Sequence, residues 1–106
     1  MLLGKETDLH VNILEKTQIE SLKMGGLLAV NQGSIDPPTF TIIEHKPENY
    51  KNKQPIVLVG KGVVYATGGL SLKPTPNSMD IMKSDMGGAA AIVGAIYLAS
   101  LQQVPL

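Results

Sequence analysis

The chain has 106 residues, of which 43% are hydrophobic, with nine basic and nine acidic side chains and a formal net charge of +0. This length corresponds to one small domain, and the balanced charge offers no basic surplus for binding nucleic-acid phosphates. The chain has no cysteine, which excludes disulfides, thiolate zinc sites and cysteine nucleophiles. Proteins without cysteine are easily accommodated in a reducing compartment, so we expect a cytoplasmic protein. The balanced charge leads us to expect no nucleic-acid partner.

The charged side chains are distributed unevenly along the sequence. Beyond residue 53 the only charged residues are Lys61, Lys73, Asp80, Lys83 and Asp85, and residues 86–106 carry none. A surface helix normally has a polar face, so this last segment is predicted to be buried on all sides. Its compact apolar part, residues 89–101, is shorter than the roughly 20 residues of a membrane span, and no membrane partner is expected. A chain of this size buries only about 60 to 65% of its unfolded surface, so we expect more chain or partner subunits to cover the helix.

The first half of the chain is predicted to form two strands separated by a helix. Apolar and polar residues alternate over residues 9–14, which indicates a half-buried strand. Thr17 and Glu20 have the spacing of a capping box, so a helix is expected to begin there and to bend or pack closely at Gly25 and Gly26. After a pair of prolines, residues 39–44 are predicted to form the second strand.

The second half is predicted to add a buried strand, a long connection and a final helix. Residues 55–59 (PIVLV) form a continuous apolar run, which is typical of a strand covered on both faces. Residues 62–66 are expected to add a short extended piece. Residues 67–80 are rich in Gly, Pro, Ser and Thr, and connections of this length are often functional. Asp85 is placed as the N-cap of a helix over residues 86–101. The pattern indicates the α/β class.

Lys61 lies between two glycines at the carboxyl end of the predicted buried strand. Ligands of open α/β sheets bind at this end of the strands. A desolvated lysine loses its proton more easily, and the neutral amine can act as a nucleophile, a base or a metal ligand. The alternative is a solvent-exposed turn lysine, which position alone favours.

The residues that follow offer weaker candidates for a site. Gly68 and Gly69 fit either an anion-binding nest of backbone N–H groups or a tight turn. Their surroundings lack the spacing of a phosphate-binding loop or of a dinucleotide fingerprint. Lys73 can neutralise an oxyanion, although a lone loop lysine is usually solvated. The N-cap role already accounts for Asp85, so a metal role for it needs a separate argument.

Three segments closely resemble the leucyl aminopeptidase (cytosol aminopeptidase) family: VGKG at residues 59–62, YATGGLSLKP at 65–74 and MDIMKSDMGGAA at 79–90. The family pattern is VGKG, then D-[ST]-GG-x-S-x-K, then M-x-x-M-K-x-D-M-x-G-A-A, and the resemblance covers about residues 9–104. It implies part of a mixed, mostly parallel sheet flanked by helices. It also implies that residues 1–106 are a partial catalytic domain, without the family's N-terminal domain and C-terminal half.

The resemblance implies a chemistry for three of these residues. Enzymes of the family use two divalent metals, Zn²⁺ or Mn²⁺, to remove N-terminal residues, often leucine, from peptide substrates. Lys61 and Asp85 match metal ligands, and Lys73 matches the catalytic lysine that stabilises the oxygen of the tetrahedral intermediate. The family forms hexamers, so self-association is expected.

Two departures from the family pattern argue against activity of this chain alone. Ala66 stands where the family has an aspartate that bridges the two metals, and a methyl group cannot bind an ion. The family's second motif, N-T-D-A-E-G-R, does not occur in the chain. Lys61 and Asp85 then remain, whereas protein metal sites take three or four ligands per ion. We therefore expect weak metal binding at best and no cofactor site other than the metals.

Three hypotheses stay open at this point. The first is a part of a metalloaminopeptidase catalytic domain that is inactive alone. The second is a non-enzymatic, degenerate paralogue that serves as an interaction or assembly module through its charge-free helix. The third is an excerpt of a longer protein carrying an introduced substitution at Ala66.

Overall fold

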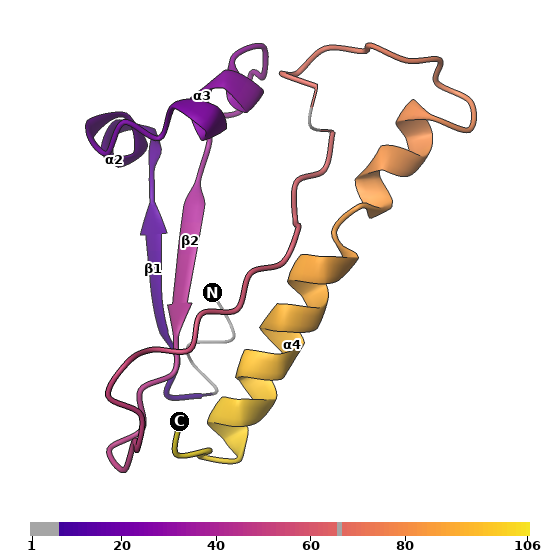
Figure 1. The fold of residues 1–106 in the computed structure, drawn as a ribbon. Coiled ribbons are helices and arrows are strands. Elements are labelled where there is room, and N and C mark those ends of the chain that lie inside the picture. Colours follow the sequence, from indigo (N-terminus) through magenta and orange to yellow (C-terminus); the bar gives the residue numbers. More distant parts are fainter. Residues whose placement is uncertain (1–6, 66) are drawn as a thin grey trace.

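The computed structural model describes residues 7–65 and 67–106, so Ala66 lies outside the described residues. The elements in chain order are β1 (His10–Leu14), α2 (Lys16–Ser21), α3 (Gly25–Asn31), β2 (Phe40–Glu44), the 3-10 helix η1 (Met79–Ser84) and α4 (Gly87–Leu101). The chain runs along β1, returns along β2, runs back through residues 55–65 and returns again along α4 (Figure 1). The fold thus combines strands and helices, as the sequence predicts.

The sheet of the described residues consists of β1 and β2, which pair antiparallel. The register places His10 opposite Glu44 and Leu14 opposite Phe40. The predicted strands at residues 9–14 and 39–44 are confirmed, each to within one residue at its start. Alternating apolar residues mark the first, and the preceding pair of prolines marks the second. The parallel part of the expected sheet is not seen among the described residues.

The predicted first helix is two short helices, and its start differs from the prediction. Glu15 is the N-cap of α2 and forms a capping box with Gln18, whose Oε1 accepts from the Glu15 N–H at 2.9 Å. Thr17 therefore lies inside the helix, and its predicted capping role is wrong. Glu15 and Gln18 have the same spacing two residues earlier and satisfy the free N–H groups of the first turn. The helix then breaks at Lys23, which has a positive φ of 55°, and Gly25 begins α3.

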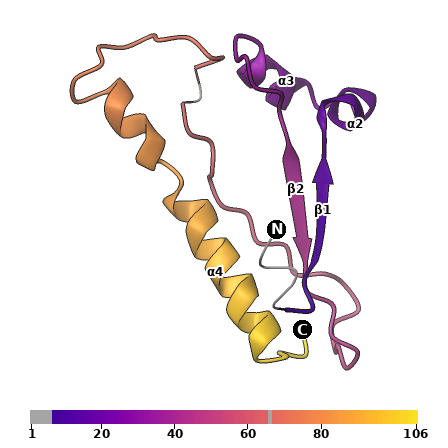
Figure 2. The same cartoon turned by 180° about the vertical axis from the view of Figure 1, so that it is seen from behind.

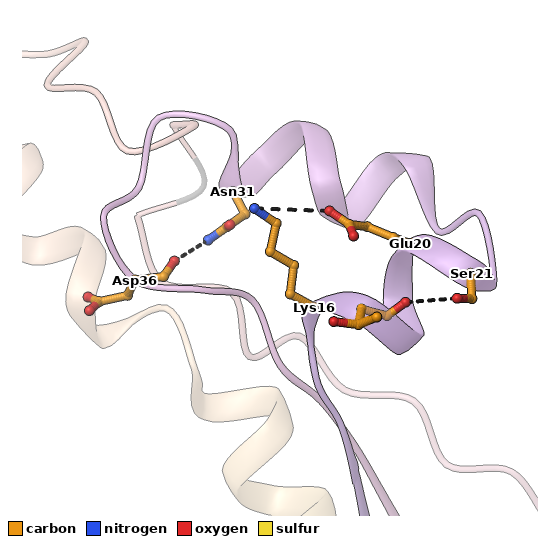
Figure 3. A network of polar contacts seen from close by, with 6 residues as sticks. Lys16, Glu20, Ser21, Asn31 and Asp36 are labelled. Carbon is orange, nitrogen blue, oxygen red and sulfur yellow. Dashed lines mark hydrogen bonds and ion pairs between the residues drawn. The ribbon is translucent and has the colours of Figure 1, made fainter.

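Exposed polar contacts lie within α2 and at the return from α3 toward β2 (Figure 3). Lys16 and Glu20 form an i,i+4 ion pair with 4.0 Å between Nζ and Oε1. At the end of α3, the side-chain amide of Asn31 donates to the backbone carbonyl of Asp36 at 2.9 Å. This bond closes the turn that leads toward β2.

The predicted buried strand at residues 55–59 is wrong for the described chain. These residues follow an extended path between β2 and α4 but pair with no strand (Figures 1 and 2). Their side chains are exposed, from 53% for Leu58 to 88% for Val59. The composition of the segment favours a strand, yet no described strand satisfies its backbone N–H and C=O groups.

The final helix is confirmed to within one residue, but its predicted cap is wrong. Met86 is the N-cap of α4, and Asp85 instead follows η1, with its N–H donating to the carbonyl of Met82 at 3.3 Å. The chain is already turning as a 3-10 helix up to Ser84, which leaves Asp85 as the junction between the two helices. The side chain of Asp85 is thereby free to reach another segment.

The predicted burial of α4 is not seen, because Ser100 is its only buried residue among those described. By length and composition, the stretch Met79–Leu101 is apolar enough to cross a membrane. The core helix of a larger domain meets the same criteria, and the 15 residues of α4 extend only about 22 Å. This is less than the roughly 30 Å of a bilayer core.

Hydrogen bonds fasten the C-terminal turn after α4 to the hairpin. His45, which directly follows β2, donates from Nε2 to the carbonyl of Val104 at 3.0 Å. Gln103 Nε2 donates to Asp8 Oδ2 at 3.0 Å, just before β1. We call these two bonds the clasp. It holds the far end of α4 beside the open end of the hairpin.

The molecule is loosely packed for its size. Its accessible surface is 8038 Å², compared with about 5,700 Å² for a compact protein of the same mass. The radius of gyration is 16.5 Å, compared with about 13 Å for a compact chain of this length. Its buried aliphatic residues within the described ranges are Leu9, Leu14 and Ile19. Residues 56–59, with Leu98 and Leu101 of α4, are among the large hydrophobic residues left exposed.

Candidate active site

The structure brings together Lys61 and Asp85, two of the three residues that the sequence singles out. Lys61 Nζ and Asp85 Oδ2 form an ion pair and a hydrogen bond, although the residues are 24 positions apart in the chain. Lys61 belongs to the extended segment beside α4, and Asp85 lies at the junction between η1 and α4. The fold therefore brings the motif at residues 59–62 next to the motif at residues 79–90.

Backbone contact between the two segments places these side chains. The N–H of Ala89, in the first turn of α4, donates to the carbonyl of Lys61 at 2.9 Å. The Cα of Gly60 faces the backbone of Gly88 so closely that a Cβ on Gly60 would meet the Gly88 carbonyl. Residues 60–62 thus run against the start of α4, as Figure 2 shows from behind.

The Lys61–Asp85 pair stands in contact with solvent. The side chains are 60% and 56% exposed, respectively. Of the two interpretations of Lys61, the structure therefore bears out the exposed lysine, and the expected low-water environment is absent. The pair as it stands is an electrostatic contact between two segments.

Lys73 lies apart from this pair in the structure. It is exposed in the connection between residues 67 and 78, which passes from the neighbourhood of α3 to η1 (Figure 1). Within residues 7–65 and 67–106, no hydrogen bond or ion pair joins Lys73 to Lys61 or Asp85. The predicted connection itself is confirmed up to residue 78, after which η1 replaces its last part.

Gly68 and Gly69 form a tight turn against the end of α3. Both have positive φ angles, 67° and 81°. A Cβ on Gly69 would collide with the backbone of Gly33 and with the N–H of Ser34. Glycine is needed here for its conformation and for this close approach. Of the two interpretations, the tight turn accounts for the observed geometry.

The described residues do not by themselves fit a two-metal centre. Nowhere in the described ranges do three or more His, Cys, Asp or Glu side chains gather in one place. Asp85 is a suitable oxygen donor, and Lys61 is engaged with it. A pair of donors falls short of the three or four that one protein metal site takes.

The sequence identifies Lys61 and Asp85 separately but does not predict that they pair. Signals for the pairing are present in retrospect. Glycines flank Lys61 on both sides, and two more follow shortly after Asp85. Backbones with no Cβ on facing positions can approach closely, which is how a segment and a helix come to touch here.

Comparison with known proteins identifies relatives of nearly the whole chain. The model of the "Cytosol aminopeptidase family, catalytic domain" matches residues 2–106. A protein of Chlorobium luteolum named "Probable cytosol aminopeptidase" is 52% identical over 103 residues, which cover 97% of this chain and 20% of the relative. A protein of Desulfovibrio desulfuricans with the same name is 42% identical over the same shares of the two chains.

The chain spans 20% of the length of these curated relatives. No solved structure matches it significantly. The similarity covers the segments that contain Lys61, Lys73 and Asp85.

Proposed function

This chain belongs to the cytosol aminopeptidase family, and from this premise we propose that it supplies part of an aminopeptidase active site. The family consists of peptidases, which act on peptides, and is generally metal-dependent. The proposed reaction of the complete site is removal of N-terminal residues, leucine among them, in the cytoplasm. For this chain alone we propose no turnover.

The observation that carries the proposal is the Lys61–Asp85 contact. The VGKG segment and the MKSDMGG segment are distant in sequence, and the fold brings the side chains of Lys61 and Asp85 together. A site needs its groups at fixed separations before it can bind or react, and this contact supplies one such separation. In the complete site we assign both residues to one metal, and the proximity of their side chains, rather than the ion pair itself, supports that assignment.

Lys73 is assigned the role of stabilising the oxyanion. Its side chain is exposed in a connection rich in glycine and proline. An ammonium at the developing negative charge lowers the barrier of acyl transfer, and the side chain is long enough to reach from a loop. This role follows from the family motif G-G-x-S-x-K, which the chain matches at residues 68–73.

Two features support the absence of turnover in this chain. Ala66 offers no ligand where the family has an aspartate, and the described residues hold no cluster of three metal-binding side chains. Zn²⁺ or Mn²⁺ is therefore expected to bind weakly to the isolated chain.

The test is hydrolysis of leucine p-nitroanilide by the purified 106-residue protein with added Mn²⁺ or Zn²⁺. We expect no release of p-nitroaniline above the protein-free control. Turnover that a chelator abolishes, and that Lys73→Ala lowers, would refute the proposed inactivity. Ala66→Asp is expected to remain inactive, since the other ligands of the centre are still missing.

A second candidate function is a non-enzymatic interaction or assembly module. The observation that favours it is the exposure of large apolar side chains on residues 56–59 and on α4. Contiguous exposed apolar surface marks interaction sites in soluble proteins. Sedimentation distinguishes the two candidates, because a monomer at all concentrations contradicts the assembly module and leaves the first proposal intact.

A further inference from the structure

We infer that Gly60, Gly62 and Gly88 are positioning residues for the Lys61–Asp85 pair. Because these glycines have no side chain, residues 60–62 can lie directly on the first turn of α4. This contact determines the distance between the backbones of Lys61 and Asp85. The catalytic meaning of this contact rests on the proposed function, whereas the contact itself is present in the structure.

Gly60 makes the closest of these approaches. A Cβ at this position would meet the carbonyl oxygen of Gly88, with the Gly88 carbonyl carbon at 2.6 Å and Ile92 Cδ1 at 2.5 Å. The side chain of Ile92 can rotate away, but the backbone of Gly88 is fixed by the helix. Any larger residue at position 60 therefore pushes the segment away from α4.

Gly88 and Gly62 complete the contact from either side. A Cβ on Gly88 would lie 3.0 Å from the backbone nitrogen of Lys61, and one on Gly62 would lie 2.7 Å from the Cβ of Ala89. The hydrogen bond from the Ala89 N–H to the Lys61 carbonyl fixes the register between the two backbones. Three glycines and one backbone bond thus surround the residue that bears the functional amine.

Other glycines of the same helix show that this closeness is local. A Cβ on Gly87 or Gly94 would have no atom of another segment within 4 Å. Both are helical positions, so they differ from Gly88 in what they face and not in backbone conformation. Gly94 is therefore a matched control for Gly88.

The contact matters because small displacements separate the pair. A carboxylate and an ammonium hold a hydrogen bond over a narrow range of distance. Functional groups displaced by about 1 Å lose much of their joint effect. A Cβ forced between residues 60–62 and α4 displaces Lys61 relative to Asp85 by a comparable amount.

The experiment is zero-length cross-linking of the full chain with a water-soluble carbodiimide, read by mass spectrometry. The reagent activates the Asp85 carboxylate, and the Lys61 amine displaces the urea and forms an amide. Wild type and Gly94→Ala are expected to give the peptide that joins Lys61 to Asp85. Gly60→Ala and Gly88→Ala are expected to give at least several-fold less of it.

A size exchange and a stability control separate positioning from general destabilisation. Gly62→Ala is expected to lower the yield, and adding Ala89→Gly is expected to restore it, because the obstructing methyl is then gone. Ile19→Val weakens the core far from this contact, and its yield per folded molecule, with folding followed by circular dichroism, is expected to equal that of wild type.

Wild-type yield in folded Gly60→Ala and Gly88→Ala would overturn the inference, as would an equal loss in Ile19→Val or failure of Ala89→Gly to rescue. Cross-linking requires no peptide hydrolysis. An active chain therefore refutes the proposed inactivity without touching this result, and a negative cross-linking result leaves the assay of activity unchanged.

Discussion

At the scale of single residues, Lys61 and Asp85 form an ion pair whose position matters more than its strength. Both side chains are more than half exposed, so water screens their attraction. Exposed ion pairs contribute about 0 to 1 kcal/mol to stability, because ordering two long side chains offsets much of the attraction. The ion pair is therefore a result of how the backbones of residues 60–62 and of the start of α4 are arranged, and it contributes little to the stability of that arrangement.

The strength of this pair can be measured with a double-mutant cycle. Lys61→Met, Asp85→Asn and the double variant are expected to give a coupling free energy below about 1 kcal/mol in urea unfolding. High salt is expected to reduce it further, because salt screens exposed charges. A coupling well above 2 kcal/mol would show that the pair is desolvated in solution.

Ile19 contributes far more to stability than either charged residue. It is fully buried, at 0% exposure, whereas Leu22, at the C-cap of the same helix, is 61% exposed. Ile19→Ala is expected to cost about 2 to 5 kcal/mol, and Leu22→Ala less than about 1 kcal/mol. Chemical denaturation followed by circular dichroism tests this, and equal losses would contradict the observed burial.

At the scale of elements, the break between α2 and α3 depends on one strained residue. Lys23 has a φ of 55°, in the left-handed region that non-glycine residues avoid at a cost of about 1 to 2 kcal/mol. Gly25 and Gly26, which the sequence marks as the point of interruption, instead begin α3. The turn at Lys23, just before the two glycines, interrupts the helix where the glycine pair was expected to do so.

Replacing two lysines by glycine is expected to change stability in opposite directions. Lys23→Gly relieves the left-handed strain and is expected to stabilise the protein by up to about 1 kcal/mol. Lys16→Gly, inside α2, is expected to destabilise it by about 1 kcal/mol. Both variants remove one exposed positive charge, and Lys16→Gly also removes the ion pair with Glu20, which contributes no more than about 0.5 kcal/mol. Opposite shifts of the two unfolding midpoints would therefore report mainly on backbone conformation. Equal signs would contradict the conformation of Lys23.

The sequence predicts some elements well because local chemistry determines them. The strand at residues 9–14 follows from its alternation of apolar and polar residues, and the strand at 39–44 from the prolines that precede its apolar residues. The helix that ends at Leu101 follows from a long uncharged apolar run. The predicted cap at Thr17 is wrong because Glu15 and Gln18 form the capping box of α2. The predicted cap at Asp85 is wrong because Asp85 ends η1 and Met86 takes the N-cap position of α4. The strand at 55–59 is wrong because a strand requires a partner, which local sequence cannot supply.

The candidate site is predictable to the same degree. Lys61, Lys73 and Asp85 are identifiable from their motifs, and the family is confirmed. The contact between Lys61 and Asp85 is not predictable, since it depends on Gly60 meeting Gly88 across 28 positions of chain. Their roles on a metal and on the oxyanion remain predictions.

At the scale of the whole molecule, apolar surface is left without cover. The accessible area of 8038 Å² exceeds that of a compact protein of this mass by roughly 40%. Part of the excess lies on residues 55–59, an uncharged extended segment that pairs with neither strand of the described sheet. Such a segment is suited to pairing with another chain.

Self-association through this segment is therefore expected at micromolar concentrations and above. Val57→Lys with Val59→Lys is expected to shift sedimentation toward the monomer, since charge on an extended edge disfavours pairing. Asn52→Lys with Gln54→Lys adds the same charge outside the segment and is expected to leave association largely unchanged. An equal shift in both variants would attribute the effect to net charge.

The clasp at the end of α4 has a consequence for how the molecule opens. The Gln103–Asp8 bond joins residues 95 positions apart, and α4 packs only sparsely on the other described helices and strands. Loss of the clasp would release the C-terminal end of α4 from the hairpin, while the β1–β2 ladder stays closed. Hydrogen exchange is then expected to show α4 amides opening at a lower free energy than those of β1 and β2. Equal opening free energies in α4 and in the strands would show that the protein unfolds as one cooperative unit. Lower values in α4 would mean that α4 opens before the strands, so that a single melting temperature describes only one of the two transitions.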